Sequence, residues 1–239
     1  MPTAFGYDPA IIERFPGVVG GIIYAVGLRN VAAPPELATM YRKEQERVAT
    51  RLLETPIAEI PSIAEWRRTF TACGVKPTQY RVAAEALLRR LHKHGDIPHI
   101  NPLVDLANLL SIRYALPVAV FDQAGVTGTT TVRFADGDES FTDLAASEPV
   151  SPAPGEVIFV DAARLVSARR WCWRQSAQSA TTSLTTDALI TIEAVHQNGR
   201  ESIDAAVADG CELLRRFQPD AVVTGTVLTA AEPVVKFGR

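Results

Sequence analysis

The segment INPLVDLANLLSIRYALPVAVFD, residues 100–122, decides the fold of this 239-residue chain. Its first part, from Pro102, is apolar with a helical composition, and its second part, from Pro117, resembles a buried strand. Proline favours the first turn of a helix and interrupts a helix that has already formed. We therefore predict a helix beginning near Pro102 that leads directly into a strand ending at Asp122.

Three polar residues at the start of this helix are candidates for ligand contact. Asn101 precedes Pro102, where its side chain can cap free backbone N–H groups. Asp105 and Asn108 lie three residues apart and share one face of the helix. These residues are substrate-binding candidates, or they form a polar network that fixes the helix to a neighbouring loop. The residue pattern leaves both interpretations open.

The rest of the chain predicts an α+β protein with a helical N-terminal third. The expected strands are 18–28, 157–162 and 188–195, and the expected helices are 35–53, 63–71, 78–95 and 200–217. A hairpin is expected around the turn sequence ADGD at 135–138, and 220–229 forms a final strand or a loose tail. We divide the chain into an N-terminal strand and helical extension, residues 1–77, packed on a core domain, residues 78–239.

Composition and charge are those of an ordinary globular protein. Apolar residues make up 47% of the chain and charged residues 21%, which excludes a disordered or fibrous class. The formal charge of −3 gives no overall attraction to nucleic acid or to an acidic membrane, so an RNA contact needs a local basic strip. No Walker loop, G-x-S-x-G elbow or metal-ligand spacing occurs. We therefore expect no metal, no cofactor, no membrane and no DNA as partners.

The cysteines and the N-terminus predict a cytoplasmic protein. The three cysteines include no C-x-x-C pair, so they suit neither a disulfide framework nor a zinc ribbon and favour a reducing compartment. The first residues lack the basic and apolar regions of a signal peptide. No apolar run approaches the roughly 18 residues that cross a bilayer.

The segment RRWCWRQ, residues 169–175, is the densest group of binding side chains in the sequence. In an extended chain, Trp171 and Trp173 would share one face, and Arg170 and Arg174 the other. Indole rings stack on bases, and guanidinium groups bind phosphate or carboxylate. The alternative is that the tryptophans belong to the core and the arginines face solvent. The substrate-binding candidates here are Arg169, Arg170, Trp171, Trp173, Arg174 and Gln175.

Glu193 lies in the apolar strand LITIEAV, where alternation places it on the same face as Thr191. A glutamate in such a position usually points to solvent, and composition alone favours that position here. If the strand instead borders a pocket, Glu193 could bind an ammonium group or orient a water molecule.

Residues 100–122 are similar to the signature of the B3/B4 domain of the phenylalanyl-tRNA synthetase β subunit, in which a V-V-D-x-x-N-Y helix runs into Q-P-x-H-A-F-D. The matching residues are Val104, Asp105, Asn108, Pro117, Phe121 and Asp122. The order of the later strands agrees, so the resemblance covers roughly residues 78–217. A Y-R-x-x-x-E-A-L-type helix, residues 80–87 here, makes the chain most similar to stand-alone B3/B4 proteins.

The resemblance implies a layered β/β/α core and a proofreading activity, in which the ester between a tRNA and a wrong amino acid is hydrolysed. This ester is already activated, so a positioned water and charge stabilisation could suffice. Glu193 matches the pocket glutamate that helps to recognise the misplaced amino acid, and it becomes the catalytic candidate. The implied partner is the 3′ end of a tRNA or aminoacyl-tRNA, with a free amino acid as a second candidate.

The sequence departs from the family pattern at two places. Ala119 stands where the family has its pocket histidine, and residues 169–175 stand about where the family has a glycine-rich segment. Tryptophan and arginine side chains fill space that glycine leaves open. We therefore expect a different ligand or a loss of hydrolysis. The alternative function is a non-catalytic module that binds RNA or an amino acid.

Overall fold

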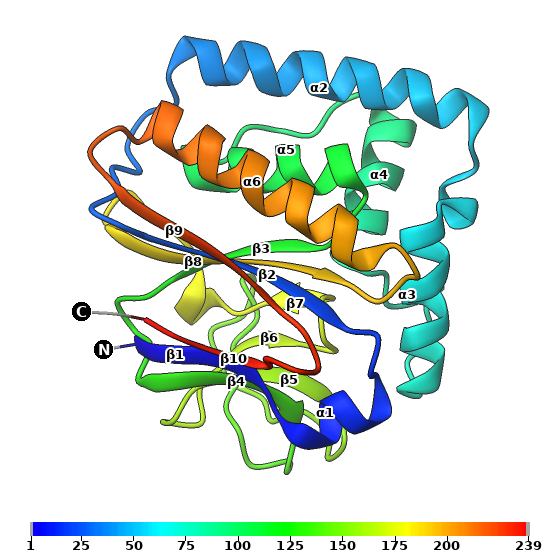
Figure 1. The fold of residues 1–239 in the computed structure, drawn as a ribbon, viewed down its shortest axis with the longest axis vertical. Helices are drawn as coiled ribbons and strands as arrows, with labels where there is room; N and C mark the ends of the chain where they lie inside the picture. Colours follow the sequence, from blue (N-terminus) through cyan, green and yellow to red (C-terminus); the bar gives the residue numbers. More distant parts are fainter. Residues whose placement is uncertain (1, 238–239) are drawn as a thin grey trace.

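The computed structural model describes residues 2–237, which form two β-sheets covered on one side by helices (Figure 1). The elements in chain order are β1 (Pro2–Tyr7), α1 (Pro9–Arg14), β2 (Val19–Val26), α2 (Pro35–Glu54), a 3-10 turn (Ile57–Glu59), α3 (Pro61–Ala72), α4 (Ala83–His94), α5 (Pro102–Tyr114), β3 (Val118–Asp122), β4 (Gly128–Phe134), β5 (Val157–Val160), β6 (Val166–Arg169), β7 (Arg174–Gln175), a second 3-10 turn (Ala177–Ser179), β8 (Asp187–Ala194), α6 (Gly199–Phe217), β9 (Val222–Leu228) and β10 (Val234–Lys236). The helix from Pro102 and the strand ending at Asp122 are confirmed.

The elements stack in three layers, which Figure 1 shows from the side. One sheet has six strands in the order β10-β1-β4-β5-β6-β7, and the other has four in the order β3-β8-β2-β9. Helices α5 and α6 cover the outer face of the four-stranded sheet, and α2 lies across them. The fold is therefore α+β with a layered β/β/α core, as predicted.

The first 77 residues contribute a strand to each sheet. β1 lies between β10 and β4, and β2 lies between β8 and β9. β1 runs parallel to β4, whereas all the neighbours in the four-stranded sheet are antiparallel. The domain division at residue 77 stays a prediction, and it separates strands that are hydrogen-bonded to later parts of the chain.

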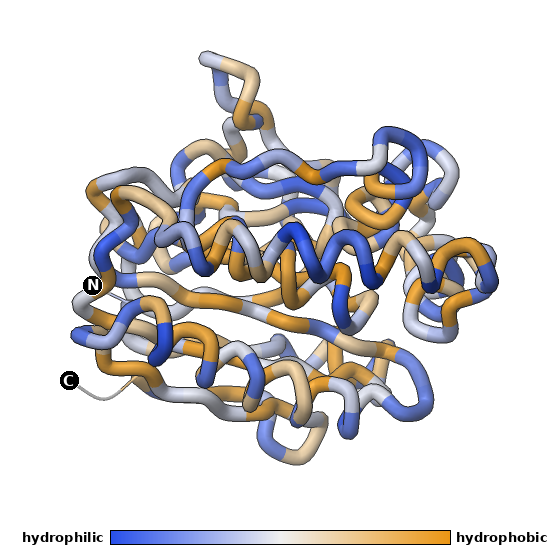
Figure 2. Tube along the Cα trace, turned by 90° about the horizontal axis from the view of Figure 1, so that it is seen from above, coloured by the Kyte–Doolittle hydropathy of each residue, from blue (hydrophilic) through white to orange (hydrophobic). Residues whose placement is uncertain are grey.

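Helix α6 packs closely on β2 because glycines lie at the contact. A Cβ atom on Gly21 would lie 2.5 Å from Val207, and one on Gly210 would lie 2.6 Å from Ile23. A larger side chain at either position would force the two elements apart. Hydrophobic and hydrophilic residues alternate along the helices in Figure 2, since one face of each helix is buried. Within residues 2–237, no helix combines the length and the hydropathy needed to cross a membrane.

The hairpin expected around residues 135–138 is wrong. β4 pairs with β1 on one side and β5 on the other, so both of its edges are occupied. Glu139 closes the loop instead, because its carboxylate accepts hydrogen bonds from the N–H groups of Asp136 and Gly137, both at 2.9 Å. The residues that follow Glu139 therefore form isolated bridges with later segments rather than a second arm.

The helix expected from Thr78 begins later, at Ala83. The backbone N–H of Ala83 donates to the carbonyl oxygen of Cys172 at 2.9 Å, which ties the first turn of α4 to the chain between β6 and β7. Gly95 ends the helix as predicted, with a φ angle of 79° that suits glycine.

Candidate ligand-binding pocket

A pocket with a cavity volume of about 90 Å³ lies between the two sheets. Its walls are mostly apolar side chains from β3, β5 and β6, and its polar groups come from β8 and from residues 171–175. Of the residues selected in the sequence, the pocket brings together Trp171, Trp173, Arg174, Gln175 and Glu193. A concave, largely apolar space with a few polar groups is the usual form of a small-molecule site.

Glu193 is the buried acid of the pocket, with 2% of its surface exposed. Its Oε1 accepts hydrogen bonds from the Tyr7 hydroxyl at 2.7 Å and from Nε1 of Trp171 at 3.0 Å. Its Oε2 accepts a hydrogen bond from the Cys172 thiol, with Sγ 3.0 Å away. The expectation from composition that Glu193 faces solvent is therefore wrong.

The three donors to Glu193 are all uncharged, and this shapes its protonation. Burial raises the pKa of the Glu193 carboxyl, and the three hydrogen bonds lower it by less. Burial and the nearby carboxyl also raise the pKa of Tyr7 and of Cys172, so both groups remain protonated donors at neutral pH. Cys172 is consequently a poor nucleophile, because the reactive form of cysteine is the thiolate.

Gly20 makes room for the hydrogen bond between Tyr7 and Glu193. It is the cross-strand partner of Glu193 in the register of β2 and β8. A Cβ atom on Gly20 would lie 2.4 Å from the hydroxyl oxygen of Tyr7. Since Tyr7 ends β1 and Glu193 belongs to β8, this hydrogen bond links the two sheets.

Residues 170–173 form a tight turn between β6 and β7, so the predicted extended alternation of this segment is wrong. Arg170 and Trp171 have φ angles of 45° and 58°, in the left-handed region. The turn buries Trp171, which packs edge-on against Trp66 with ring centroids 5.2 Å apart. Trp173 stays partly exposed and lines the pocket. The two tryptophans therefore do not share a face.

Trp173 and three neighbours form a cation–π stack, which we call the rim cluster. Tyr80 packs edge-on against Trp173, with ring centroids 4.9 Å apart. The guanidinium carbons of Arg170 and Arg174 lie 4.7 and 4.9 Å from the centroid of the Trp173 ring. Arg170 also lies 3.9 Å from the centre of the Tyr80 ring. The cluster thus holds two guanidinium groups against an aromatic surface at the pocket. Each also pairs with a carboxylate, Arg170 with Glu156 at 3.6 Å and Arg174 with Asp143 at 3.3 Å.

Arg169 and Gln175 differ in whether their side chains keep a hydrogen-bonding group free for a ligand. Arg169 forms a bidentate ion pair with the buried Glu156, at 2.7 and 2.9 Å, and lies outside the pocket lining. Gln175 lines the pocket, and its Nε2 donates to the backbone carbonyls of Val120 and Ser179, both at 2.8 Å. The guanidinium group of Arg169 is thus already paired within the protein, whereas the side-chain oxygen of Gln175 remains available to accept a hydrogen bond from a ligand.

Comparison with known proteins decides the family. The family model described as the B3/4 domain matches residues 65–205, more than half of the chain. The chain belongs to the B3/4 domain family. The predicted relationship to the phenylalanyl-tRNA synthetase β subunit is confirmed by one sequence relative and one solved structure.

The sequence relative is the phenylalanine–tRNA ligase beta subunit of Shewanella oneidensis, 32% identical over 94 residues. The match covers 39% of this chain and 12% of that protein, so the chain spans a small part of the relative's length. The solved structure is an N-terminal fragment of the phenylalanyl-tRNA synthetase β subunit from Pyrococcus horikoshii. It matches with a TM-score of 0.52 and 10% identity, over 95% of this chain and 54% of that one. At this identity, the likeness establishes a shared fold.

Asp105 and Asn108 of this B3/4 domain lie on α5 and Asn101 directly precedes it, all outside the pocket lining. Asn101 caps the helix, since its side chain accepts a hydrogen bond from the N–H of Val104 at 3.0 Å. Asp105 is buried and accepts one from the N–H of Ile100, also at 3.0 Å. These bonds agree with the polar-network interpretation. Ligand contact by the three residues stays a prediction.

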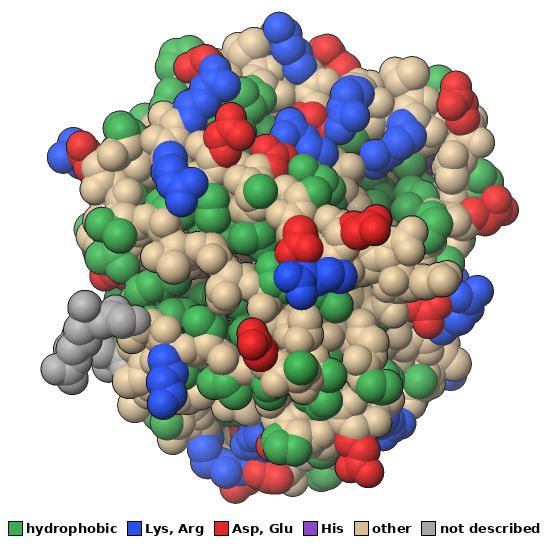
Figure 3. Space-filling model, viewed as in Figure 1, with side chains coloured by type: hydrophobic (Ala, Val, Ile, Leu, Met, Phe, Trp, Pro, Cys, Tyr) green, Lys and Arg blue, Asp and Glu red, His purple; other side chains and the backbone are tan. Residues whose placement is uncertain are grey.

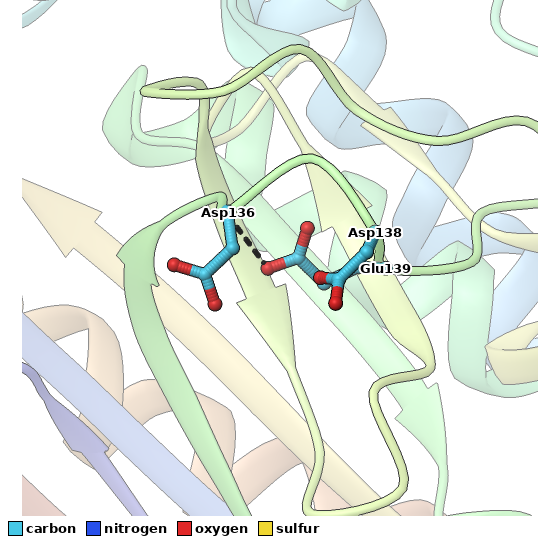
Figure 4. Close-up of side chains that lie close together, drawn as sticks. All are labelled: Asp136, Asp138 and Glu139. Atoms are coloured by element: carbon cyan, nitrogen blue, oxygen red, sulfur yellow. Dashed lines mark hydrogen bonds between the residues drawn. The ribbon is translucent and has the colours of Figure 1, made fainter.

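Asp136, Asp138 and Glu139 lie together in the loop after β4 (Figure 4). Their carboxylate oxygens lie within 4.8 Å of one another, a spacing that a cation could use. Arg164 pairs with all three, and Arg133 pairs with Glu139 at 2.7 Å. Two guanidinium groups already pair with these three carboxylates, and the loop lies outside the pocket lining.

Basic and acidic side chains are interspersed over the side of the B3/4 domain that Figure 3 shows, with the helices in its upper part. Arg113, for example, pairs with Glu44 at 2.8 Å and with Asp209 at 2.7 Å. Such paired charges do not form a field of one sign along the helices. The basic groups that stand beside the pocket are those of the rim cluster.

Three residues that position side chains of the pocket were missed from the sequence. Tyr7 and Gly20 give no local signal, because they approach Glu193 only when strands distant in sequence come together. Tyr80 lies in the matched segment 80–87, but its contact with Trp173 depends on the turn that follows β6.

Proposed function

We propose that this chain binds the aminoacylated 3′ end of a tRNA and hydrolyses mischarged aminoacyl-tRNA in trans. The observation that carries the proposal is the convergence of Trp173, Arg174, Gln175 and Glu193 on one pocket, in a chain related to a phenylalanine–tRNA ligase beta subunit. An acid, an amide oxygen and a cationic aromatic rim together suit a ligand with an ammonium group and a nucleotide.

The charges of the pocket favour one orientation of such a ligand. Glu193 is buried in the pocket wall, whereas the side chain of Arg174 is 42% exposed. An aminoacyl-tRNA end carries its positive charge on the amino acid and its negative charges on the phosphates. The amino acid therefore enters towards Glu193, and the phosphates stay near Arg170 and Arg174.

The rim cluster gives the terminal nucleotide a place to bind. A partly exposed indole beside guanidinium groups is the combination that binds single-stranded nucleotides without reading their sequence. Stacking on one aromatic side chain contributes roughly 1–3 kcal/mol per base. Trp173 therefore supplies stacking, and Trp171, which is buried, supports the turn that presents it.

Hydrolysis of an aminoacyl ester depends more on the positioning of the attacking water than on a strong base. Water attacks the ester carbonyl, the bond from the carbonyl carbon to the tRNA 3′ oxygen breaks, and that oxygen takes up a proton. Glu193 is the catalytic candidate, because a buried carboxylate with a raised pKa accepts a proton more readily than an exposed one. It holds either the amino group or the attacking water.

The second candidate function is binding of RNA or an amino acid without hydrolysis. Two observations favour it over the enzyme. Glu193 already accepts three hydrogen bonds from Tyr7, Trp171 and Cys172, which restrict its movement. Ala119 lines the pocket where the resembling family has a histidine, so one polar group is missing from the site.

A cytoplasmic location is part of the proposal. Cys73, Cys172 and Cys211 are all free thiols, which suits a reducing compartment, and charged tRNAs are present there.

Deacylation assays with a panel of correctly charged and mischarged tRNAs test the proposed function. We expect the protein to release at least one amino acid faster than the uncatalysed rate, and Trp173→Ala to weaken tRNA binding about 5- to 100-fold through lost stacking. Trp173→Phe, which keeps an aromatic ring, is the matched control. If charged tRNAs bind but none is deacylated, the non-catalytic function replaces the enzyme. If none binds, both the enzyme and the tRNA-binding function are excluded.

A further inference from the structure

We propose that Thr191 and Gln175, together with Oε2 of Glu193, form the binding place for the α-ammonium group of the ligand. The place lies next to Ala119, and we call it the ammonium notch. This inference rests on the proposed function and deepens it, because it states which part of the aminoacyl group the pocket recognises.

Thr191 is the observation that points to a ligand. It lines the pocket and is 2% exposed. Within residues 2–237, its hydroxyl makes no hydrogen bond to the protein, and its oxygen is not among the fully buried atoms that lack a partner, so it keeps accessible surface at the pocket. A hydroxyl that opens into a pocket without a protein partner is free to bond a ligand, so a ligand that supplies a partner gains binding free energy.

Ala119 leaves the space that a ligand group needs beside Thr191. The two residues are direct cross-strand neighbours in the register of β3 and β8, and both line the pocket. Cross-strand neighbours have Cβ atoms about 4.5–5.5 Å apart, so a long side chain at position 119 would cover the Thr191 hydroxyl. The methyl group of Ala119 does not reach it.

Gln175 contributes an acceptor whose orientation is fixed. Its Nε2 has two hydrogens, and both are donated, to the carbonyl oxygens of Val120 and Ser179 at 2.8 Å. The amide therefore cannot flip without losing both bonds. Its Oε1 remains as an acceptor in a residue that lines the pocket.

Glu193 supplies the negative charge and the third acceptor. Its Oε1 already accepts from two strong donors, Tyr7 and Trp171. Among residues 2–237, its Oε2 accepts only from the Cys172 thiol, a weak donor, and so retains capacity for another hydrogen bond. An ammonium group has three N–H donors, which matches the hydroxyl of Thr191, Oε1 of Gln175 and Oε2 of Glu193.

The ammonium notch predicts a selectivity that the family resemblance does not specify. The ligand must carry a free α-amino group, since an acetylated amine is uncharged, has one N–H and is too large for the space beside Ala119. The side chain of the amino acid then lies against Phe121, Phe159 and Ala168, which line the pocket with apolar surface. The preferred ligand is therefore an aminoacyl group with an apolar side chain and an unmodified amine.

Calorimetry with non-hydrolysable analogues tests this inference. The probes are 3′-aminoacylamido-3′-deoxyadenosines carrying a panel of amino acids, each with a free or an N-acetylated amine, added to the full chain. We expect acetylation to weaken binding at least about tenfold, as loss of charge-assisted hydrogen bonds does. Equal affinity for the two forms would overturn the notch while leaving the proposed function intact. If no free-amine probe binds, the proposed function fails as well.

A matched pair of variants identifies the residue involved. Thr191→Val has nearly the same shape without the hydroxyl, and Thr191→Ser keeps the hydroxyl. We expect Thr191→Val to bind the free-amine probe about five- to tenfold more weakly, and Thr191→Ser to stay within about twofold of the natural protein. Both variants should fold normally, because the hydroxyl makes no bond to the described residues. Unchanged affinity of Thr191→Val would overturn the assignment.

Discussion

The surroundings of Glu193 control the protonation of its carboxyl group. The strand around it is apolar, and its two oxygens accept hydrogen bonds from a phenol, an indole and a thiol. None of these donors carries a charge, so the desolvation of the carboxyl is only partly offset and its pKa lies above the usual value. A cationic ligand would favour the ionised form, which links the binding of an ammonium group to the charge of this residue.

The raised pKa predicts how stability depends on pH. The folded protein binds the Glu193 proton more tightly than the unfolded chain, whose glutamate titrates near 4.5. The stability that the Glu193 proton contributes is therefore fully present below about pH 4.5, and it is lost as pH rises through the pKa of Glu193 in the folded protein. Glu193→Gln removes this titration, so the natural protein should lose stability relative to the variant over that range. Urea unfolding of both proteins from pH 4 to 8 measures the difference, and a pH-independent difference would contradict the prediction.

Gly20 should not tolerate a side chain. In Gly20→Ala, the new Cβ would lie 2.4 Å from the Tyr7 hydroxyl, which must then move away from Glu193. We expect the free energy of unfolding to fall by about 1–3 kcal/mol. Gly17→Ala is the matched control, because its nearest neighbour lies 3.9 Å away, and it should change stability by less than about 0.5 kcal/mol. Chemical denaturation of both variants checks this, and equal effects would exclude the clash.

Single elements were predictable where their pattern is local. The helix from Pro102 and the strand ending at Asp122 follow from proline positions and apolar runs, and they form as expected. The prediction for residues 169–175 was wrong because the structure of this segment depends on distant residues. Its alternation predicts an extended strand, but the left-handed φ angles of Arg170 and Trp171 turn the chain, and burial of Trp171 against Trp66 and Glu193 supplies the reason. Those partners come from other elements, so no local pattern reveals the turn.

Helix α5 provides a prediction at the scale of one element. Asn101→Ala removes the hydrogen bond from the N–H of Val104 and should lower the free energy of unfolding by about 1 kcal/mol. Asn101→Asp keeps a capping oxygen and should retain most of the stability. Because Asn101 lies outside the pocket lining, neither variant should change affinity for the aminoacylamido-adenosine probe. A loss of affinity without a loss of stability would instead make Asn101 a ligand-binding residue.

At the scale of the whole molecule, the layered β/β/α architecture followed from the resemblance to the B3/B4 domain, but the edges of the sheets did not. Strands β1 and β10 pair with each other although they stand at opposite ends of the chain, and neither was predicted. The pocket shares this property. Glu193, Gln175 and Trp173 could be selected from the sequence, whereas Tyr7 and Gly20 join the site only because β1 and β2 bring two sheets together around it.

The central claim is that this pocket recognises the aminoacylated end of a tRNA. The most direct test is an equilibrium binding titration of the full chain with a tRNA that carries an amide-linked amino acid, and with the same tRNA ending in a free 3′ hydroxyl. We predict at least tenfold tighter binding of the aminoacylated tRNA, about 1.4 kcal/mol or more. Equal affinity for the two tRNAs would contradict the account.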